Sequence, residues 1–328
     1  MTVEALTPQP ELQTAFSQLK QRLSQQIIGQ NHLVERLLIA LLADGHLLVE
    51  GAPGLAKTRA IKSLSDQLEA DYHRIQFTPD LLPADITGTD IFNRQSNSFN
   101  FQPGPIFHNL VLADEINRAP AKVQSALLEA MAERQVSIGS TTYSLPDLFL
   151  VMATQNPIEQ EGTFPLPEAQ LDRFLMQVLI DYPQIEDERQ ILLLVRNESL
   201  QSNENPAPLL NQSTLFAARK EVQKLYAAEI VDEYMVQLVM ATRRPEEYDE
   251  SLSDWIEYGA SPRGTIALDS CARAYAWLQC RDYVTPADVQ AIVHDVLRHR
   301  ILLSFEAQAQ GITTDQVIDK LLDVVIAP

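Results

Sequence analysis

Eight residues constrain the fold of this chain more than any others, the sequence GAPGLAKT at residues 51–58. They follow a short apolar run, His46–Val49, and precede a segment, Ala60–Leu68, whose apolar residues have helical spacing. A glycine-containing turn between a strand and a helix can direct backbone N–H groups toward phosphate oxygens, and the start of the helix adds positive potential. The segment therefore predicts a phosphate-binding loop within an α/β fold.

The residues of this loop divide into two groups by role. The backbone of six residues would surround the phosphates: Gly51, Ala52, Pro53, Gly54, Leu55 and Ala56. The ammonium of Lys57 can reach the β- and γ-phosphates, and the hydroxyl of Thr58 can coordinate Mg²⁺. The commoner pattern has glycine before the lysine, and the methyl group of Ala56 narrows the allowed backbone without forbidding the loop. An ordinary strand–helix turn is the alternative interpretation.

A second apolar strand, Leu110–Ala113, ends in two carboxylates, Asp114 and Glu115. Asp114 would hold Mg²⁺, mostly through water, and Glu115 would act as the general base toward an attacking water. The alternative is a solvated acidic strand end. Because the phosphate loop and this strand occur in the order that a nucleotide site requires, together they predict hydrolysis of a nucleoside triphosphate.

Three further polar residues can be placed around a bound nucleotide. Asn156 follows the apolar run Phe149–Ala153 and could orient the water near the γ-phosphate, although an Asn-Pro turn is equally consistent with it. Arg173 could stabilise the transition state from a neighbouring subunit, and Arg263 could touch the γ-phosphate from a second domain. An Asp–Arg surface pair and a helix-start loop are the alternatives for these two arginines.

Short apolar runs alternate with helical patterns through the first part of the chain. Five runs read as strands: His46–Val49, His73–Phe77, Leu110–Ala113, Phe149–Ala153 and Phe174–Ile180. Residues 10–26 are an example of the intervening amphipathic helices. This alternation predicts an α/β doubly wound core, a mostly parallel sheet covered by helices on both faces.

The second part of the chain reads as helices only. A polar segment with two prolines, Asn197–Ser213, separates it from the first part. Thr285-Pro-Ala-Asp288 has the residue types of a helix start, with a capping threonine and proline at the first helical position. We expect a core over residues 1–190, a linker over 191–212 and an all-α domain over 213–328.

The composition excludes several classes of protein. The chain has 328 residues, 45% of them hydrophobic, which excludes a disordered or collagen-like protein. No aliphatic run approaches the ~20 residues of a membrane span, and the N-terminus lacks the pattern of a secretory signal. Cys271 and Cys280, if both lie on one helix, are about 13.5 Å apart and cannot form a disulfide. Free thiols and the absence of a secretory signal together predict a cytoplasmic protein.

The net charge of −19 bears on which kind of molecule this chain can bind. Both parts of the chain are acidic, and no cluster of lysine or arginine provides the basic surface that nucleic-acid binding usually needs. We therefore expect no nucleic-acid partner. Six acidic residues lie within 246–257, where a solvated loop is favoured over a partner surface or a trap for divalent cations.

Several segments together resemble the MoxR family of AAA+ ATPases. They are GAPGLAKT, LADEINRAP, Gln124–Glu133, Ala153–Phe174 and Gly259–Gly264, and the similarity extends from about Ile28 to Arg300. MoxR-like loops themselves read GLAKT, so Ala56 agrees with this family. The resemblance implies an AAA+ P-loop core with a five-stranded sheet, followed by a helical lid that closes on ATP and Mg²⁺.

The resemblance also implies a role for each candidate residue. Lys57 and Thr58 belong to Walker A, Asp114 and Glu115 to Walker B; Asn156 is sensor 1, Arg173 the arginine finger and Arg263 sensor 2. Ile28 and Gly29 would lie at the adenine end of a nucleotide held between core and lid. An insertion at Thr87–Phe101 and a hairpin at Gln135–Leu145 correspond to loops that related ATPases use on their substrates.

The function that the resemblance implies is chaperone-like remodelling by a ring, most simply a hexamer. MoxR-like proteins resemble chaperones that act with proteins carrying a von Willebrand factor A domain, in maturation or metal-cofactor insertion. A magnesium-chelatase-like motor subunit is the alternative within the same class. A nucleic-acid motor related to replicative helicases and a scaffold that does not hydrolyse nucleotide are the alternatives from other classes; the acidic charge disfavours the first, and intact Lys57, Asp114 and Glu115 disfavour the second.

Overall fold

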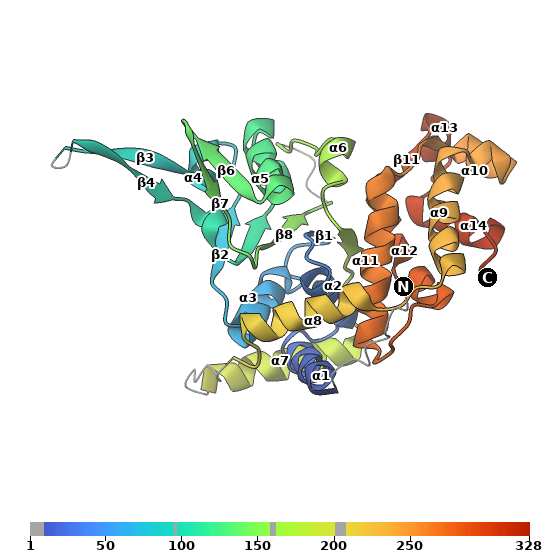
Figure 1. Cartoon of the computed structure of the whole chain (residues 1–328), viewed down its shortest axis with the longest axis horizontal. Helices are drawn as coiled ribbons and strands as arrows, with labels where there is room; N and C mark the ends of the chain where they lie inside the picture. The colour runs from blue at the N-terminus through green and yellow to red at the C-terminus, as the bar shows by residue number, and fades with distance from the viewer. Residues whose placement is uncertain (1–9, 95–96, 158–161, 201–207) are drawn as a thin grey trace, which may run out of the picture.

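The computed structural model describes residues 10–94, 97–157, 162–200 and 208–328. Five strands form one sheet in the order β2-β5-β8-β1-β9, and every neighbouring pair is parallel (Figure 1). The strands coincide with the five predicted runs: β1 (Leu47–Glu50), β2 (Tyr72–Gln76), β5 (Leu110–Asp114), β8 (Leu150–Gln155) and β9 (Met176–Leu179). The doubly wound α/β core predicted from the sequence is confirmed.

Alternate residues of each strand enter opposite layers of the core. Leu47 and Val49 pack into one apolar cluster, while Leu48 between them packs into the other. This period of two requires helices on both faces of the sheet. The first cluster includes residues of α1 (Pro10–Gln26), α2 (Asn31–Leu42) and α3 (Lys57–Gln67), and the second those of α4 (Pro83–Thr87) and α5 (Ala121–Glu133).

Two antiparallel hairpins extend from the core, as predicted for the insertion and for the segment before Asn156. They are β3 (Gly88–Asn93) with β4 (Ser98–Pro103), and β6 (Gln135–Ile138) with β7 (Thr141–Ser144). The first projects farthest from the sheet (Figure 1). Stacked rings of Phe101 and Tyr143, with centroids 4.0 Å apart, join the two hairpins. Residues 95–96 of the insertion lie outside the described residues.

The second part of the chain is helical with one exception. Its helices are α8 (Gln212–Lys224), α9 (Glu229–Arg243), α10 (Glu250–Trp255), α11 (Pro262–Leu278), α12 (Pro286–Leu297), α13 (Phe305–Ala309) and α14 (Thr314–Val324). Thr285 and Asp288 form the predicted helix start as a reciprocal capping box. The helical lid predicted from the sequence is confirmed, and it also contains one short antiparallel pair, in which β10 (Ile256–Tyr258) pairs with β11 (Leu302–Leu303). Both strands are too short to show in the periodicity.

The predicted linker has more structure than its polar composition indicates. Helix α7 (Ile185–Leu200) runs through the predicted core boundary at residue 190, and residues 201–207 lie outside the described residues. Helix α8, assigned to the lid, also contacts the core, because Arg219 Nε donates to the Leu41 carbonyl at 2.9 Å. The boundaries 1–190, 191–212 and 213–328 therefore remain a prediction.

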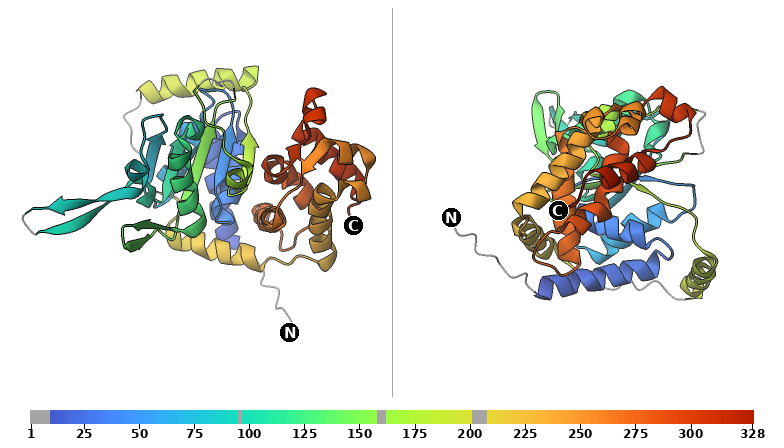
Figure 2. Two further views of the ribbon diagram at one scale, coloured as in Figure 1. Left: turned by 90° about the horizontal axis from the view of Figure 1, so that it is seen from above. Right: turned by 90° about the vertical axis from the view of Figure 1, so that its right-hand side faces the viewer.

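Buried ion pairs connect the core and the lid. Arg36 of α2 donates from Nε to the Asp295 carboxylate of α12 at 2.6 Å, and both side chains are buried. Arg300 Nε lies 2.9 Å from the Asp172 carboxylate. Since an unpartnered buried charge would be costly, these pairs fix how the lid sits beside the sheet (Figure 2). Among the described residues, no helix is long and apolar enough to cross a membrane.

A buried histidine beside the sheet predicts how stability depends on pH. His46 Nδ1 accepts from the Val151 N–H at 3.0 Å and Nε2 donates to the Met131 carbonyl at 3.3 Å, an arrangement for the neutral ring. Burial, with help from the Arg134 charge, lowers the pKa of His46 to about 3. The unfolded chain therefore binds a proton below about pH 6.5 that the folded chain excludes.

We accordingly expect the free energy of unfolding to fall as the pH is lowered from 6.5 toward 3. His46 alone contributes a slope of about 1.4 kcal/mol per pH unit in this window. Urea unfolding at several pH values should show a slope that is smaller by this amount in His46→Gln. An identical slope in the two proteins would mean that His46 is protonated in the folded chain.

Candidate active site

The phosphate loop has the backbone conformation that its sequence predicts. It joins the end of β1 to the start of α3, with left-handed φ angles at Gly54 (+85°) and Ala56 (+58°). Ala56 adopts this conformation at a cost of about 1–2 kcal/mol, which explains why glycine is commoner there. At Gly51 a side chain is excluded, since an added Cβ would lie 2.4 Å from Ile180 Cγ1.

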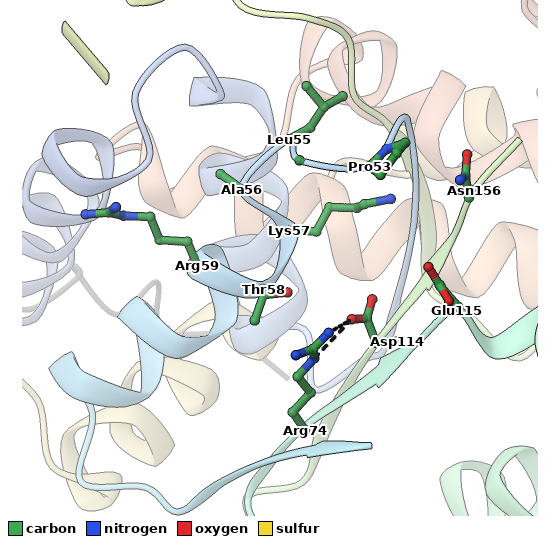
Figure 3. A pocket seen from close by; sticks show the side chains of 11 residues that line it. Pro53, Leu55, Ala56, Lys57, Thr58, Arg59, Arg74, Asp114, Glu115 and Asn156 are labelled. Atoms are coloured by element: carbon green, nitrogen blue, oxygen red, sulfur yellow. Dashed lines mark hydrogen bonds and ion pairs between the residues drawn. The ribbon is translucent and has the colours of Figure 1, made fainter. Parts of the chain in front are cut away.

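A cavity of about 410 Å³ lies over the loop and brings most of the predicted residues together. Its lining consists of Pro53, Gly54, Leu55, Ala56, Lys57, Thr58, Arg59, Arg74, Asp114, Glu115 and Asn156. Apart from Arg74 of β2, these residues lie in the loop after β1 with the first turn of α3, or at the carboxyl ends of β5 and β8, where parallel sheets bind ligands. Lys57 and Thr58 lie opposite Asp114 and Glu115 in the cavity, and Asn156 lies beyond them (Figure 3).

Lys57 is held in place by backbone carbonyls. Its Nζ donates to the carbonyl oxygens of Gly51 at 2.7 Å and Gln155 at 3.3 Å. These two carbonyls belong to the ends of neighbouring strands, so the ammonium lies across the sheet edge above the loop. A phosphate bound to the loop would meet a cation already oriented by the fold.

Asp114 is fixed by two side chains that the sequence reasoning missed. Thr154 Oγ1 donates to Asp114 Oδ1 at 2.6 Å. Arg74 Nη2 donates to Asp114 Oδ2 at 2.6 Å (Figure 3). Thr154 is fully buried and also accepts from the Glu115 N–H at 2.9 Å. One hydroxyl thus orients the carboxylate of Asp114 and the backbone of Glu115 together.

Glu115 is held in an unusual backbone conformation. Its φ of +57° is left-handed, which side chains rarely adopt and which costs about 1–2 kcal/mol. Its carboxylate accepts from Gln76 Nε2 at 2.9 Å and lies 3.0 Å from Arg118 Nε. Backbone strain of this kind persists where the surrounding structure imposes it. The left-handed conformation turns the Glu115 carboxylate toward the cavity (Figure 3).

The donor set of the cavity fits a magnesium ion. The hydroxyl of Thr58 and the carboxylate of Asp114 line the same space, and both are hard oxygen donors. Because both Asp114 oxygens already accept hydrogen bonds from Thr154 and Arg74, Asp114 would contact the metal ion through metal-bound water. Thr58 and Asp114 are therefore the residues that would hold Mg²⁺.

A second cavity, of about 350 Å³, continues from the loop and has the character of a base site. Ile28, Tyr182, Ile191 and Leu194 give it apolar walls. Gly29, which has a φ of +80°, lies behind it against Pro183. Ile28 thus lies where the adenine was expected. The residues lining these two cavities belong to the core and α7. That a nucleotide lies between core and lid remains a prediction.

The two predicted arginines lie together in a different cavity. Arg173 and Arg263 line a space of about 440 Å³, together with Arg134 and Arg300. Asp172 ties the two segments: it accepts from Ser261 Oγ, at the start of α11, at 2.7 Å, and from Arg300 Nε. Neither Arg173 nor Arg263 lines the phosphate-loop cavity of its own chain.

Comparison with known proteins connects this geometry to a family. Residues 46–176 match the family described as ATPase family associated with various cellular activities (AAA), and residues 252–321 match an AAA lid domain. Chaperone MoxR1 of Mycobacterium tuberculosis is 45% identical over 92% of this chain and 79% of its own length. Protein MoxR of Methylorubrum extorquens is 30% identical over 96% of this chain and 95% of its own. The chain belongs to the MoxR family of AAA+ ATPases.

A solved structure has the same fold as this MoxR-family chain. The crystal structure of a Cytophaga hutchinsonii protein aligns with a TM-score of 0.90 and 44% identity, covering 97% of this chain and 96% of the other. The uncharacterized protein YeaC of Bacillus subtilis is 42% identical over 98% of this chain and 97% of its own. An AAA+ core followed by a lid is thus the architecture of this MoxR-family ATPase.

The acidic stretch 246–257 of this MoxR-family chain is not the solvated loop expected from the sequence, because it includes α10 and most of β10. Asp249 caps α10 by accepting from Ser251 N–H at 2.8 Å and lies 3.0 Å from Lys320 Nζ. Glu247 lies 3.3 Å from Arg244. Within the described ranges, no group of three or more His, Cys, Asp or Glu side chains could hold a metal ion.

Thr154 offers a test of the carboxylate arrangement in this MoxR-family site. Thr154→Val keeps the volume but removes the hydroxyl that binds Asp114 and Glu115. We expect the ATP hydrolysis rate to fall about 10–100-fold, the usual effect of losing a supporting hydrogen bond beside a metal ligand. Steady-state kinetics measure this; Thr141→Val, on the exposed β6–β7 hairpin, is the control. An unchanged rate in Thr154→Val would mean that the hydroxyl does not support the carboxylates.

Proposed function

We propose that this chain binds ATP with Mg²⁺, hydrolyses it in a ring of identical subunits, and uses the free energy to remodel a partner protein. The observation that carries the proposal is the convergence of Lys57, Thr58, Asp114, Glu115 and Asn156 on one cavity. These residues come from three separate segments, and each supplies a group that phosphoryl transfer to water requires.

Each residue has a defined part in the reaction. Backbone N–H groups of the loop and the Lys57 ammonium bind the β- and γ-phosphates, and Asn156 orients a water in line with the γ-phosphorus. Glu115 accepts a proton from that water as its oxygen bonds to phosphorus and the bond to the β-phosphate oxygen breaks. Mg²⁺, held by Thr58 and Asp114, neutralises negative charge on the phosphates.

The positions of Arg173 and Arg263 support the assembly of several chains. Positive charge near the γ-phosphate accelerates phosphoryl transfer, yet Arg173 and Arg263 line a cavity apart from the loop of their own chain. We call the surface around this cavity, with Arg173 and Arg263, the arginine face. A head-to-tail contact between two chains would bring the arginine face of one against the phosphate cavity of the next. We propose that both arginines act on the neighbour; for Arg263 this replaces the action from its own lid expected from the sequence. Repeated contacts of this kind close into a ring, for which the family resemblance implies a hexamer.

Work on a protein is supported by the relatives and by the projecting hairpin. The Mycobacterium tuberculosis relative is named a chaperone. At the far part of the β3–β4 hairpin, Phe92 and Phe99 pack on each other and remain exposed, as a surface for a client would. We propose a cytoplasmic role with a protein carrying a von Willebrand factor A domain, in maturation or metal-cofactor insertion. A chelatase-like motor subunit remains the second candidate.

The experiment that tests the proposal measures ATP binding and ATP hydrolysis by the purified chain. Wild type should bind a fluorescent ATP analogue and release phosphate in the presence of Mg²⁺. Lys57→Ala should abolish both, whereas Lys122→Ala, an exposed lysine on α5, should change neither. Stimulation by single-stranded DNA but not by a von Willebrand factor A protein would overturn the protein-remodelling role in favour of a nucleic-acid motor.

A further inference from the structure

Helix α7 contains an unbroken aliphatic run yet has no buried side chain among those described. It spans 16 residues, Ile185–Leu200, and includes the aliphatic run Ile191–Val195. Helix α1, also on the outside of the core, buries Phe16, Leu19 and Leu23 by comparison. Since the packing of an apolar face provides most of the stability of a protein helix, α7 has the composition of a packed helix without the packing.

Among its described side chains, α7 has two half-buried apolar residues and four exposed ones, of which Leu193 lies apart from the other three. Ile191 and Leu194 are half-buried and line the base cavity. Ile185, Leu192 and Val195 are spaced by seven and three residues, which places them along another face of the helix. They are 77%, 50% and 51% exposed. We call these three residues the outer stripe.

The position of α7 points to what covers the outer stripe. The helix forms one wall of the base cavity and lies along the side of the core, as its yellow-green ribbon shows (Figure 2). A neighbouring chain that delivers Arg173 to the adjoining phosphate cavity has to approach beside this wall. The nucleotide site is incomplete without that neighbour, so the wall and the site would share one interface.

The arginine face has the surface that complements α7. Ile266 lies one turn after Arg263 on α11, lines the same cavity as Arg173 and is 66% exposed. The first turn of α7 carries three carboxylates, from Glu186, Asp187 and Glu188. The outer stripe is therefore complementary to the exposed Ile266. The acidic first turn of α7 is complementary in charge to the arginines beside Ile266.

We propose that the outer stripe of α7 is a docking surface for a second copy of this chain, whose Arg173 and Ile266 face covers it. This inference rests on the proposed ring. It makes α7 both a wall of the base site and a subunit contact. A nucleotide that moves this helix would therefore alter the interface that brings the arginines.

The first arm of the test measures assembly. In Leu192→Glu/Val195→Glu, two charges enter the stripe while Ile191 and Leu194 still line the base cavity. We expect the dissociation constant for self-association, measured by sedimentation, to rise about 30-fold or more, the effect of losing one hot-spot residue. Binding of a fluorescent ATP analogue to the single chain should be unchanged. Phe305→Glu, which adds a charge at an 81% exposed residue of the lid, is the matched control and should assemble like wild type.

The second arm assigns the stripe to one side of the interface. Arg173→Ala keeps α7 but lacks the finger, and Leu192→Glu/Val195→Glu keeps the finger but lacks the stripe. Each alone should be inactive, whereas mixing them should restore ATP hydrolysis, because the finger of the stripe variant can enter the intact site of Arg173→Ala. Without recovery on mixing, the stripe does not lie on the phosphate side and the proposal is overturned.

The failure of this inference is distinguishable from failure of the proposed function. If wild type and the stripe variant assemble equally well, the docking surface is wrong while the ring remains. If wild type stays a single chain at every concentration, with nucleotide present, both the ring and the docking surface are wrong. If the stripe variant loses nucleotide binding as a single chain, α7 serves its own site and the docking proposal falls.

Discussion

Arg173→Ala is expected to lower the ATP hydrolysis rate by about three orders of magnitude or more while leaving ATP binding to the single chain unchanged. The physical reason is the position of the arginine, which lines the cavity shared with Arg263 and not the cavity over the phosphate loop. A guanidinium that reaches the γ-phosphate from the next chain stabilises charge in the transition state without holding the nucleotide in the free subunit. Titration of single chains with a fluorescent ATP analogue, beside steady-state hydrolysis by the assembly, measures both quantities.

The matched control for Arg173→Ala is Arg244→Ala. Arg244 is an exposed arginine of the lid that pairs with Glu247 three residues away. Such a pair contributes at most about 1 kcal/mol, so both binding and hydrolysis should be those of wild type. Loss of nucleotide binding by single chains of Arg173→Ala would contradict the account and make the arginine a residue of its own site.

Glu115→Gln is expected to reduce hydrolysis about 10²–10⁴-fold and to leave ATP bound. The amide keeps the shape of the side chain but cannot accept the proton of the attacking water. Lys57, Thr58 and Asp114, which hold the phosphates and the metal, are unchanged. Single-turnover hydrolysis, followed by separation of the bound nucleotide, should find ATP on the variant where wild type has ADP.

Glu133→Gln is the control for this substitution, because Glu133 is an exposed carboxylate at the end of α5. Hydrolysis by the control should match wild type. If Glu115→Gln hydrolyses ATP at the wild-type rate, another group accepts the proton, and the strained backbone of Glu115 serves a purpose other than catalysis.

The sheet and the phosphate loop could be predicted because their signals are local. The inner strands of the parallel sheet are buried and therefore appear as short apolar runs, as in Leu110–Ala113. The loop appears as glycine, lysine and threonine at fixed spacing, and its chemistry depends on residues that are adjacent in the chain. Asp114 and Asn156 could be added because the carboxyl ends of parallel strands meet at one edge.

The supporting residues of the site could not be predicted, because their partners are distant in the sequence. Thr154 binds Asp114 from 40 residues away, and Arg74 does so from the neighbouring strand β2. Nothing in the local pattern of Arg74 distinguishes it from a solvent-exposed strand residue.

The placement of the lid was beyond sequence reasoning for the same reason. Arg36 and Asp295, which join core and lid, are 259 residues apart. Periodicity shows that each belongs to a helix but not that the two helices meet. The expected contact of Arg263 with the γ-phosphate rested on its place at a helix start of the second domain and on the family resemblance. In the structure Ser261, at the start of α11, donates to Asp172, and Arg263 lines the same cavity as Arg173.

The central claim is that two chains build one active site, and the rate of ATP hydrolysis per chain as a function of protein concentration tests it most directly. The account predicts a rate that is low for dilute chains, rises as they associate and then reaches a plateau. The rise should coincide with assembly measured by sedimentation under the same conditions. A rate per chain that is high and constant across the concentrations at which the protein passes from single chains to the assembly would contradict the account.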